Sequence, residues 1–197
     1  MPSRARTLPP RSLILPVLAL LALAGCGSSH SRVTTGTYAG ETGLNAPYLN
    51  VGALTYEVQL SRQISPFDTE DAPYLEGLTA VQSALSREQE WLGVFLQVYN
   101  HTTRAEPAAS AVTIRDTEGN AYTPVPPGAI NQFAYRAGTV PAKGRLPAAD
   151  SVAAAGPTQG ALLLYKIRIV SLNNRPLKIT ITDPTDPLQT ATATLDV

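Results

Sequence analysis

Apolar and polar residues alternate along several segments of the chain, beginning at residue 54. In residues 54–60 (LTYEVQL) every second side chain is apolar, which is typical of a β-strand with one buried face. Residues 91–100 (WLGVFLQVYN) place aliphatic side chains on one face and Trp91, Phe95 and Tyr99 on the other. We therefore predict a central strand over residues 91–100, covered by other parts of the chain on both faces.

The middle and the end of the chain contain further strand candidates. Residues 112–116 and 121–125 flank the sequence TEGN, in which Gly119 can adopt the positive φ that a tight hairpin turn needs. Residues 161–169 and 177–181 are interpreted as a second pair of neighbouring strands, separated by the turn-like sequence NNRP. Residues 131–135 are a short strand candidate, and residues 190–197, rich in β-branched side chains, are interpreted as the final strand.

This pattern of elements predicts an all-β fold. Seventeen prolines and 14 glycines are spread along the chain without a period, which indicates many turns. About seven or eight short strands without a long amphipathic helix are typical of an antiparallel β-sandwich. We expect this sandwich to occupy residues 49–197.

One segment departs from the strand pattern. Residues 65–90 separate the first two strong strands, and Pro66 and Pro73 interrupt the beginning of this insertion. Four apolar residues with the spacing of one or two helical turns follow: Leu75, Leu78, Val81 and Leu85. An insertion of this length inside a compact domain is usually functional or disordered. The strands on both sides of it already supply alternating apolar faces, so we expect the sandwich to fold without the whole of it.

The N-terminal residues 1–25 have the three parts of an export signal. Arg4, Arg6 and Arg11 form a positive segment, and residues 13–24 form an apolar one. A helix that spans the hydrocarbon core needs roughly 20 apolar residues, so this segment is too short for a permanent membrane helix. The pattern therefore predicts a signal peptide that is removed.

The signal ends in the sequence LAGC, with Cys26 as its last residue. This sequence resembles the lipobox of bacterial lipoproteins, which implies cleavage before Cys26 and attachment of diacylglycerol and fatty acids such as palmitate to that residue. An ordinary secretory signal with an incidental cysteine is the alternative. It is weakened because Cys26 is the single cysteine of the chain and stands at the position that the motif requires. We expect residues 26–48 to be a flexible tether between the lipid bilayer and an extracytoplasmic domain.

The order of segments after residue 50 resembles a known family. The relevant sequences are VYN at 98–100, IRD at 114–116, EGNAY at 118–122, QG at 159–160, LYKI at 164–167 and PLKITI at 176–181. They resemble the telokin-like immunoglobulin-fold domains of unknown function found in exported lipoproteins of bacteria, especially actinobacteria. The resemblance implies an immunoglobulin-like sandwich and a place in the cell envelope, and it supplies no catalytic residues.

Composition and charge exclude several functions. The formal net charge of the whole chain is zero and becomes −3 once residues 1–25 are removed, so nucleic acid is not an expected partner. After cleavage the chain keeps no methionine and no free thiol, and its two histidines are His30 and His101. A copper or zinc site needs three or four soft or imidazole ligands, so we expect no such metal and no cofactor. Calcium is the open alternative at residues 68–71 and 183–186, where we favour solvated turns.

Catalysis has one sequence candidate, His101, which follows Asn100 and precedes two threonines. The sequence lacks the Gly-x-Ser-x-Gly motif of a nucleophile elbow, and the segment is interpreted as a turn at a strand end, so we expect no enzyme activity. Trp91, Phe95 and Tyr99 could form an aromatic binding stripe, but we favour a second buried face.

We therefore predict a non-enzymatic binding module, displayed at the envelope, whose partner is another envelope protein. Two alternatives remain open. One is a structural accessory protein without a dedicated ligand. The other is a carrier with a small-molecule pocket between the insertion and the sandwich, which an aromatic-lined cavity of several hundred Å³ would favour.

Overall fold

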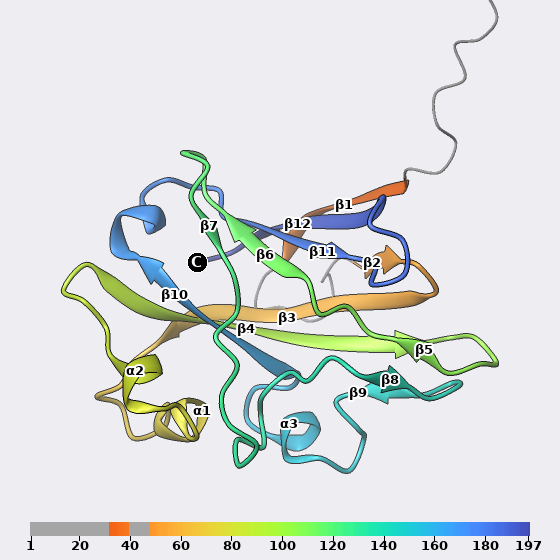
Figure 1. Cartoon of the computed structure of the whole chain (residues 1–197), viewed down its shortest axis with the longest axis horizontal. Coiled ribbons are helices and arrows are strands. Elements are labelled where there is room, and N and C mark those ends of the chain that lie inside the picture. Colours follow the sequence, from red (N-terminus) through yellow and green to blue (C-terminus); the bar gives the residue numbers. More distant parts are fainter. Residues whose placement is uncertain (1–31, 40–47) are drawn as a thin grey trace, which may run out of the picture. The chain divides into compact units, whose positions relative to one another are not determined.

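Two β-sheets lie face to face in the computed structural model, which describes the backbone of residues 32–39 and the whole of residues 48–197 (Figure 1). The described residues contain twelve strands, of which eight are at least four residues long. This confirms the expected all-β sandwich and its seven or eight main strands. The described residues belong to one compact unit, residues 31–197.

The first sheet has five strands, and all of its pairs are antiparallel except the pair of β1 with β12. Its order is β1 (Arg32–Ala39), β12 (Gln189–Leu195), β11 (Lys178–Thr182), β6 (Val112–Arg115) and β7 (Ala121–Tyr122).

The second sheet is antiparallel throughout and has β4 near its centre. Its order is β10 (Ala161–Arg168), β4 (Gln89–Asn100), β3 (Leu54–Ile64) and β2 (Tyr48–Val51), and β9 (Arg145–Leu146) pairs with the end of β4. The remaining elements are short: β5 (Glu106–Pro107), β8 (Thr139–Val140), helices α1 (Ala72–Leu75), α2 (Ala80–Ser83) and α3 (Val152–Ala155), and the 3₁₀-helix η1 (Ile169–Leu172).

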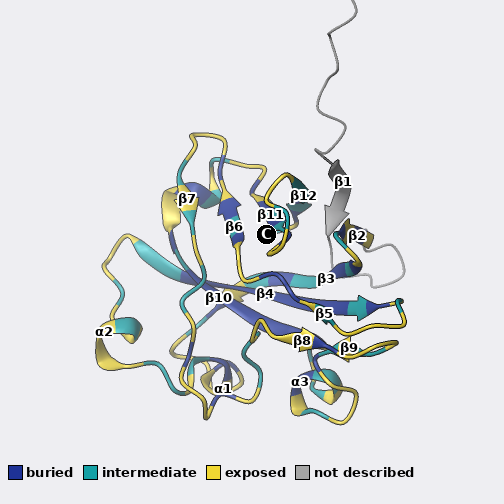
Figure 2. Cartoon of the chain, turned by 45° about the vertical axis from the view of Figure 1, so that its right-hand side comes forward, coloured by how far each residue is buried: buried dark blue, intermediate teal, exposed yellow. Residues whose placement is uncertain are grey.

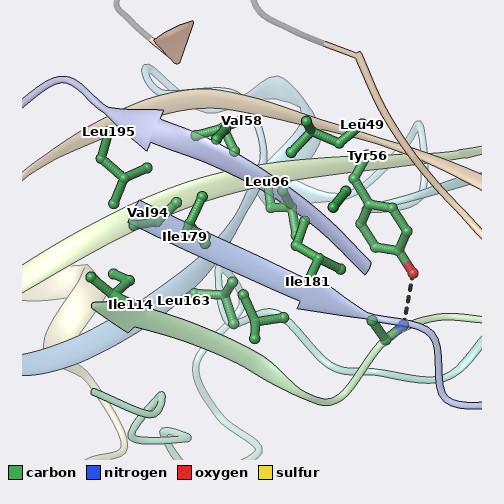
Figure 3. Packing of buried hydrophobic residues seen from close by; sticks show 14 of the residues in the cluster. Leu49, Tyr56, Val58, Val94, Leu96, Ile114, Leu163, Ile179, Ile181 and Leu195 are labelled. Atoms are coloured by element: carbon green, nitrogen blue, oxygen red, sulfur yellow. Dashed lines mark hydrogen bonds between the residues drawn. The ribbon is translucent and has the colours of Figure 1, made fainter. Parts of the chain in front are cut away.

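The space between the two sheets is the first core. Leu96 of β4 and Ile179 of β11 are fully buried there, as the close view in Figure 3 shows. Tyr56 also lies in this core, and its hydroxyl oxygen accepts a 2.8 Å hydrogen bond from the N–H of Ala109 (Figure 3). Burial raises the pKa of Tyr56 to about 12, which keeps the phenol protonated. The burial of an aliphatic side chain such as Leu96 or Ile179 stabilises the fold by about 1.5–3 kcal/mol.

The outer face of the second sheet carries a second core. Trp91 and Phe95 of β4 are buried on this face together with Tyr74 from α1. Nine of the twelve residues of β4 are buried and the other three are half-buried, and most of the strand is dark blue in Figure 2. The prediction of a central strand covered on both faces is therefore confirmed, and Trp91 and Phe95 belong to a core rather than to a binding stripe. Tyr99 was expected on the same buried face, but it is half-buried and lies outside this core.

The hairpin prediction is confirmed, and another prediction about strand pairing is wrong. β6 and β7 pair across the turn that contains Gly119, whose φ is +86°. The strands over residues 161–169 and 177–181 were expected to be neighbours, but β10 pairs with β4 in the second sheet. β11 pairs with β6 and β12 in the first sheet. The 3₁₀-helix η1 follows β10 directly, and the chain changes layer between the two strands.

Residues 131–135, a strand candidate from the sequence, form a single bridge instead of a strand. Ala134 pairs with Leu162 of β10, and the N–H of Tyr135 donates a 2.7 Å hydrogen bond to the carbonyl of Leu162. The N–H of Leu162 in turn donates to the carbonyl of Phe133 at 2.7 Å. This segment therefore covers the open edge of β10, which would otherwise expose unpaired backbone groups.

The N-terminal predictions are only partly within the described residues. β1 lies inside the segment that the sequence assigned to a flexible tether, so the first sheet takes up eight of those residues. Cys26 and the signal peptide, residues 1–25, lie outside the described residues. In the part of the chain that the structure describes, no helix is long and apolar enough to cross a bilayer.

Candidate functional site

The insertion between β3 and β4 folds into a cap, here defined as residues 65–88, over the second core. Its buried aromatic residue is Tyr74, 4% exposed, whose ring packs edge-on against Phe95 with centroids 5.2 Å apart. The same ring meets Phe133 at 4.9 Å. The predicted helical turns are present as α1 and α2. Aromatic side chains thus fill the space between the cap and the sheet.

An ion pair fixes the beginning of the cap. The guanidinium of Arg62 in β3 donates to Oδ1 of Asp71 at 2.5 Å and also lies 5.5 Å from the ring centre of Tyr74. Oδ2 of Asp71 accepts a 2.7 Å hydrogen bond from the N–H of Ser65. Burial alone would raise the pKa of Asp71, but the hydrogen bonds from Arg62 and Ser65 outweigh it and hold the pKa below its usual value.

A second cation fixes the end of the cap. Nζ of Lys166 in β10 donates to the carbonyl of Ala84 at 2.7 Å and to that of Val81 at 3.3 Å. It lies 5.3 Å from the ring centre of Trp91. These carbonyls stand at the C-terminal end of α2, where free acceptors attract a positive charge.

The loop before residue 131 holds the cap from a third direction. Nδ2 of the buried Asn131 donates to the carbonyls of Tyr74 at 3.0 Å and Glu76 at 2.9 Å. The N–H of Gly128 donates to the carbonyl of Gly77 at 2.8 Å. Gly77 has a φ of +79°, and a Cβ added there would meet Gly128 and Ile130 at 3.1 Å, so a larger residue would push the loop away.

The cap combines this fixed backbone with exposed apolar side chains. Phe67 is 96% exposed, and Val81 is 84% exposed on α2. Ile130 on the neighbouring loop is 64% exposed. The exposed parts of α1 and α2 appear in yellow in Figure 2. The sequence spacing groups Val81 with Leu75, Leu78 and Leu85. In the structure these three leucines pack against the second core, whereas Val81 is exposed.

The Asn100–His101 segment is the strand-end turn that the sequence indicated. Asn100 is buried, and its Nδ2 donates to the carbonyls of Arg104 at 2.7 Å and of Val140 at 3.0 Å. Its Oδ1 accepts from the N–H of Thr102 at 2.9 Å. His101 is exposed, and its ring stacks on that of Tyr99 with centroids 6.1 Å apart.

The two loops considered for calcium use their carboxylates to stabilise turns. Asp183 is buried, and its Oδ1 accepts hydrogen bonds from the N–H groups of Thr185 and Asp186 at 2.6 Å and 3.0 Å. Asp68 accepts from the N–H of Glu70 at 2.9 Å, and Asp71 belongs to the ion pair with Arg62. Within the described ranges, no three histidine, cysteine, aspartate or glutamate side chains gather as a metal site would require.

One buried polar network had no signal in the sequence. Oδ2 of Asp116 accepts hydrogen bonds from the hydroxyl of Ser171 and from Nδ2 of Asn120, both at 2.7 Å. The Ser171 hydroxyl also meets that of Tyr122 at 2.6 Å. Burial would raise the pKa of Asp116, but the bonds from Asn120 and Ser171 lower it to about 2. The network ties the β6–β7 hairpin to η1.

Comparisons with known proteins assign no family to this chain. No family model and no curated protein matches it. Among solved structures it is similar to the lipoprotein candidate ycdA of Bacillus subtilis (11% identity, TM-score 0.46, 77% of this chain and 39% of that chain). It is also similar to an uncharacterized β-sandwich protein of Clostridium difficile (7% identity, TM-score 0.45, 83% and 96%). A third is a functionally unknown protein of Listeria monocytogenes (10% identity, TM-score 0.48, 77% and 82%). The chain spans about two fifths of the first of these proteins, and at these values none of them assigns a function.

Proposed function

We propose that this chain is a lipid-anchored, non-enzymatic binding module of the bacterial cell envelope, and that its cap binds another envelope protein. The anchor in this proposal is Cys26 at the end of the sequence LAGC. The resemblance to telokin-like domains of exported lipoproteins supports the same location.

The observation that carries the binding proposal is the exposure of Phe67 on a fixed segment. Cap residues that contact the sheet are held by Arg62, Lys166 and Asn131, and yet Phe67 is 96% exposed. Burying a phenylalanine against a partner contributes about 1.5–3 kcal/mol. A surface that is already ordered loses little conformational entropy when a partner binds, so more of that energy appears as affinity.

The carrier alternative has less support than the protein partner. A carrier needs an internal cavity, and the carrier alternative expects this cavity between the insertion and the sandwich. Tyr74 occupies this region in edge contact with Phe95 and Phe133. The apolar surface that the cap offers is therefore on its outside, where it suits a protein better than a small molecule.

The test is crosslinking and affinity capture of the lipidated, full-length protein from its native envelope. The variant Phe67→Asp with Val81→Asp should lose the captured partner, because two charges then replace the exposed apolar side chains. The control is Leu188→Asp, a residue 54% exposed in the turn between β11 and β12. A partner that is captured equally by both variants would place the binding surface elsewhere. Capture of no partner by the unaltered protein would favour the structural accessory function.

A further inference from the structure

A second candidate site, independent of the cap, lies where β4 ends and β9 begins. An open cavity of about 450 Å³ is lined there by the aromatic residues Tyr99 and His101 and by the cationic residues Lys143 and Arg145. Pro141 and Ala148 contribute apolar walls. None of the described residues that line the cavity carries a carboxylate.

The walls of this cavity are held in place by backbone pairing. Arg145 pairs with Tyr99 across the antiparallel β4–β9 ladder, which fixes the two residues side by side. The N–H of Asn100 donates to the carbonyl of Gly144 at 2.9 Å, and Nδ2 of Asn100 donates to the carbonyl of Pro141 at 3.0 Å. The cavity is therefore preformed rather than assembled from two independent loops.

Lys143 occupies an unusual backbone conformation at the rim of the cavity. Its φ is +54°, and among the described residues it is the one residue other than glycine with a positive φ. This conformation favours glycine or asparagine, and such strained residues are often found at functional sites. Nζ of Lys143 donates to the carbonyl of His101 at 2.6 Å, which holds the ammonium group beside another residue that lines the cavity.

We propose that this cavity binds the phosphate group of a small organic phosphate. The Arg145 guanidinium provides a planar pair of donors that matches phosphate oxygens, and Lys143 adds a second positive charge. The apolar walls and the ring of Tyr99 would contact the organic part of the ligand. The same phosphate chemistry is present in a soluble metabolite and in the headgroup of an anionic lipid.

Two probes separate these sources. The first is glycerol phosphate and the second is vesicles of phosphatidylglycerol, with phosphatidylcholine vesicles as the uncharged reference. The protein is the chain from residue 27 onward, because both cores lie within the compact unit of residues 31–197. Heteronuclear NMR follows the backbone signals of residues 99–101 and 143–149, and co-sedimentation measures binding to vesicles.

Arg145→Gln removes the guanidinium and keeps the backbone pairing. It should weaken glycerol phosphate binding about tenfold or more, since a hydrogen bond to a charged group is lost. Arg115→Gln is the matched control, an exposed arginine on β6, and should bind within about twofold of the unaltered protein. Vesicle binding that Arg145→Gln abolishes would identify a lipid headgroup as the source. Absence of saturable signal changes with both probes, or equal binding by Arg145→Gln, would overturn the proposal.

Discussion

Arg62 and Asp71 form an ion pair of 2.5 Å that joins β3 to the cap. The aspartate is buried, whereas the arginine side chain keeps 32% of its surface exposed. Loss of the arginine therefore leaves a buried carboxylate with one backbone donor, the N–H of Ser65. The cap depends on this pair for its position, and so does the exposed Phe67 in the proposed function.

Arg62→Met should lower the free energy of unfolding by about 1–3 kcal/mol, because the buried carboxylate of Asp71 loses a charged donor. Arg115→Met removes an exposed arginine from β6 and should change stability by less than about 0.5 kcal/mol. Urea unfolding of the two variants measures the difference. Equal midpoints for both variants would mean that the ion pair does not stabilise the cap.

Acid should destabilise the domain through Asp116. The pKa of this carboxyl is about 2 in the folded chain, against an ordinary value of 3.8. A lowered folded pKa stabilises the protein above the ordinary value, and this contribution is lost as the pH falls from about 4 towards about 2. We expect Asp116→Asn to melt below the unaltered protein at neutral pH and the gap to narrow in this acid range. Melting temperatures recorded across the range measure it, and a constant gap would contradict the assignment.

The first core should be sensitive to truncation at its centre. Leu96→Ala and Ile167→Ala each remove a side chain that is fully buried, and such truncations cost about 2–5 kcal/mol. Thermal unfolding should show a melting temperature lower by roughly 5–20 °C. Leu172→Ala, at a residue that is only partly buried beside this core, should lose less stability. A larger loss for Leu172→Ala than for the two core variants would mean that the core has been assigned to the wrong segment.

The cap also contributes to stability, which changes the expectation from the sequence that the sandwich folds without much of the insertion. Replacing residues 69–82 with a short Gly/Ser loop removes Tyr74 and Asp71 and exposes the outer faces of Trp91 and Phe95. We therefore expect this variant to lose at least as much stability as Leu96→Ala, about 3–5 kcal/mol. Calorimetry of both variants makes the comparison. A loop variant as stable as the unaltered protein would show that the second core is dispensable.

The alternation of apolar and polar residues predicted the strands well where each face of a strand is either buried or exposed. β4 is the clearest case, since its two apolar faces in the sequence correspond to the two cores of the structure. The pairing of strands was harder to predict. Two apolar strands joined by a turn have the same sequence pattern whether they pair in one sheet or face each other in two sheets. β10 and β11 are in this position, and the prediction that they pair was wrong.

The surfaces proposed for binding were less predictable than the fold. The insertion was recognised by its length and prolines, but its spacing could not show that Phe67 is exposed while Tyr74 is buried. The cavity beside Lys143 combines residues from β4 and from the β8–β9 turn, which are about 40 positions apart. Contacts of this kind depend on the folded chain and leave no periodic signal in the sequence.

In the proposed function, a lipid on Cys26 anchors the domain to the envelope. Mass spectrometry of the N-terminal peptide of the protein isolated from its native membrane tests this claim most directly. We expect a peptide that begins at Cys26 and carries diacylglycerol, because the sequence LAGC ends the apolar segment of the export signal. The N-terminal region of a Cys26→Ser variant should carry no diacylglycerol, because it lacks the thiol that accepts this group. A native N-terminus at another residue, or an unmodified Cys26 thiol, would contradict the claim.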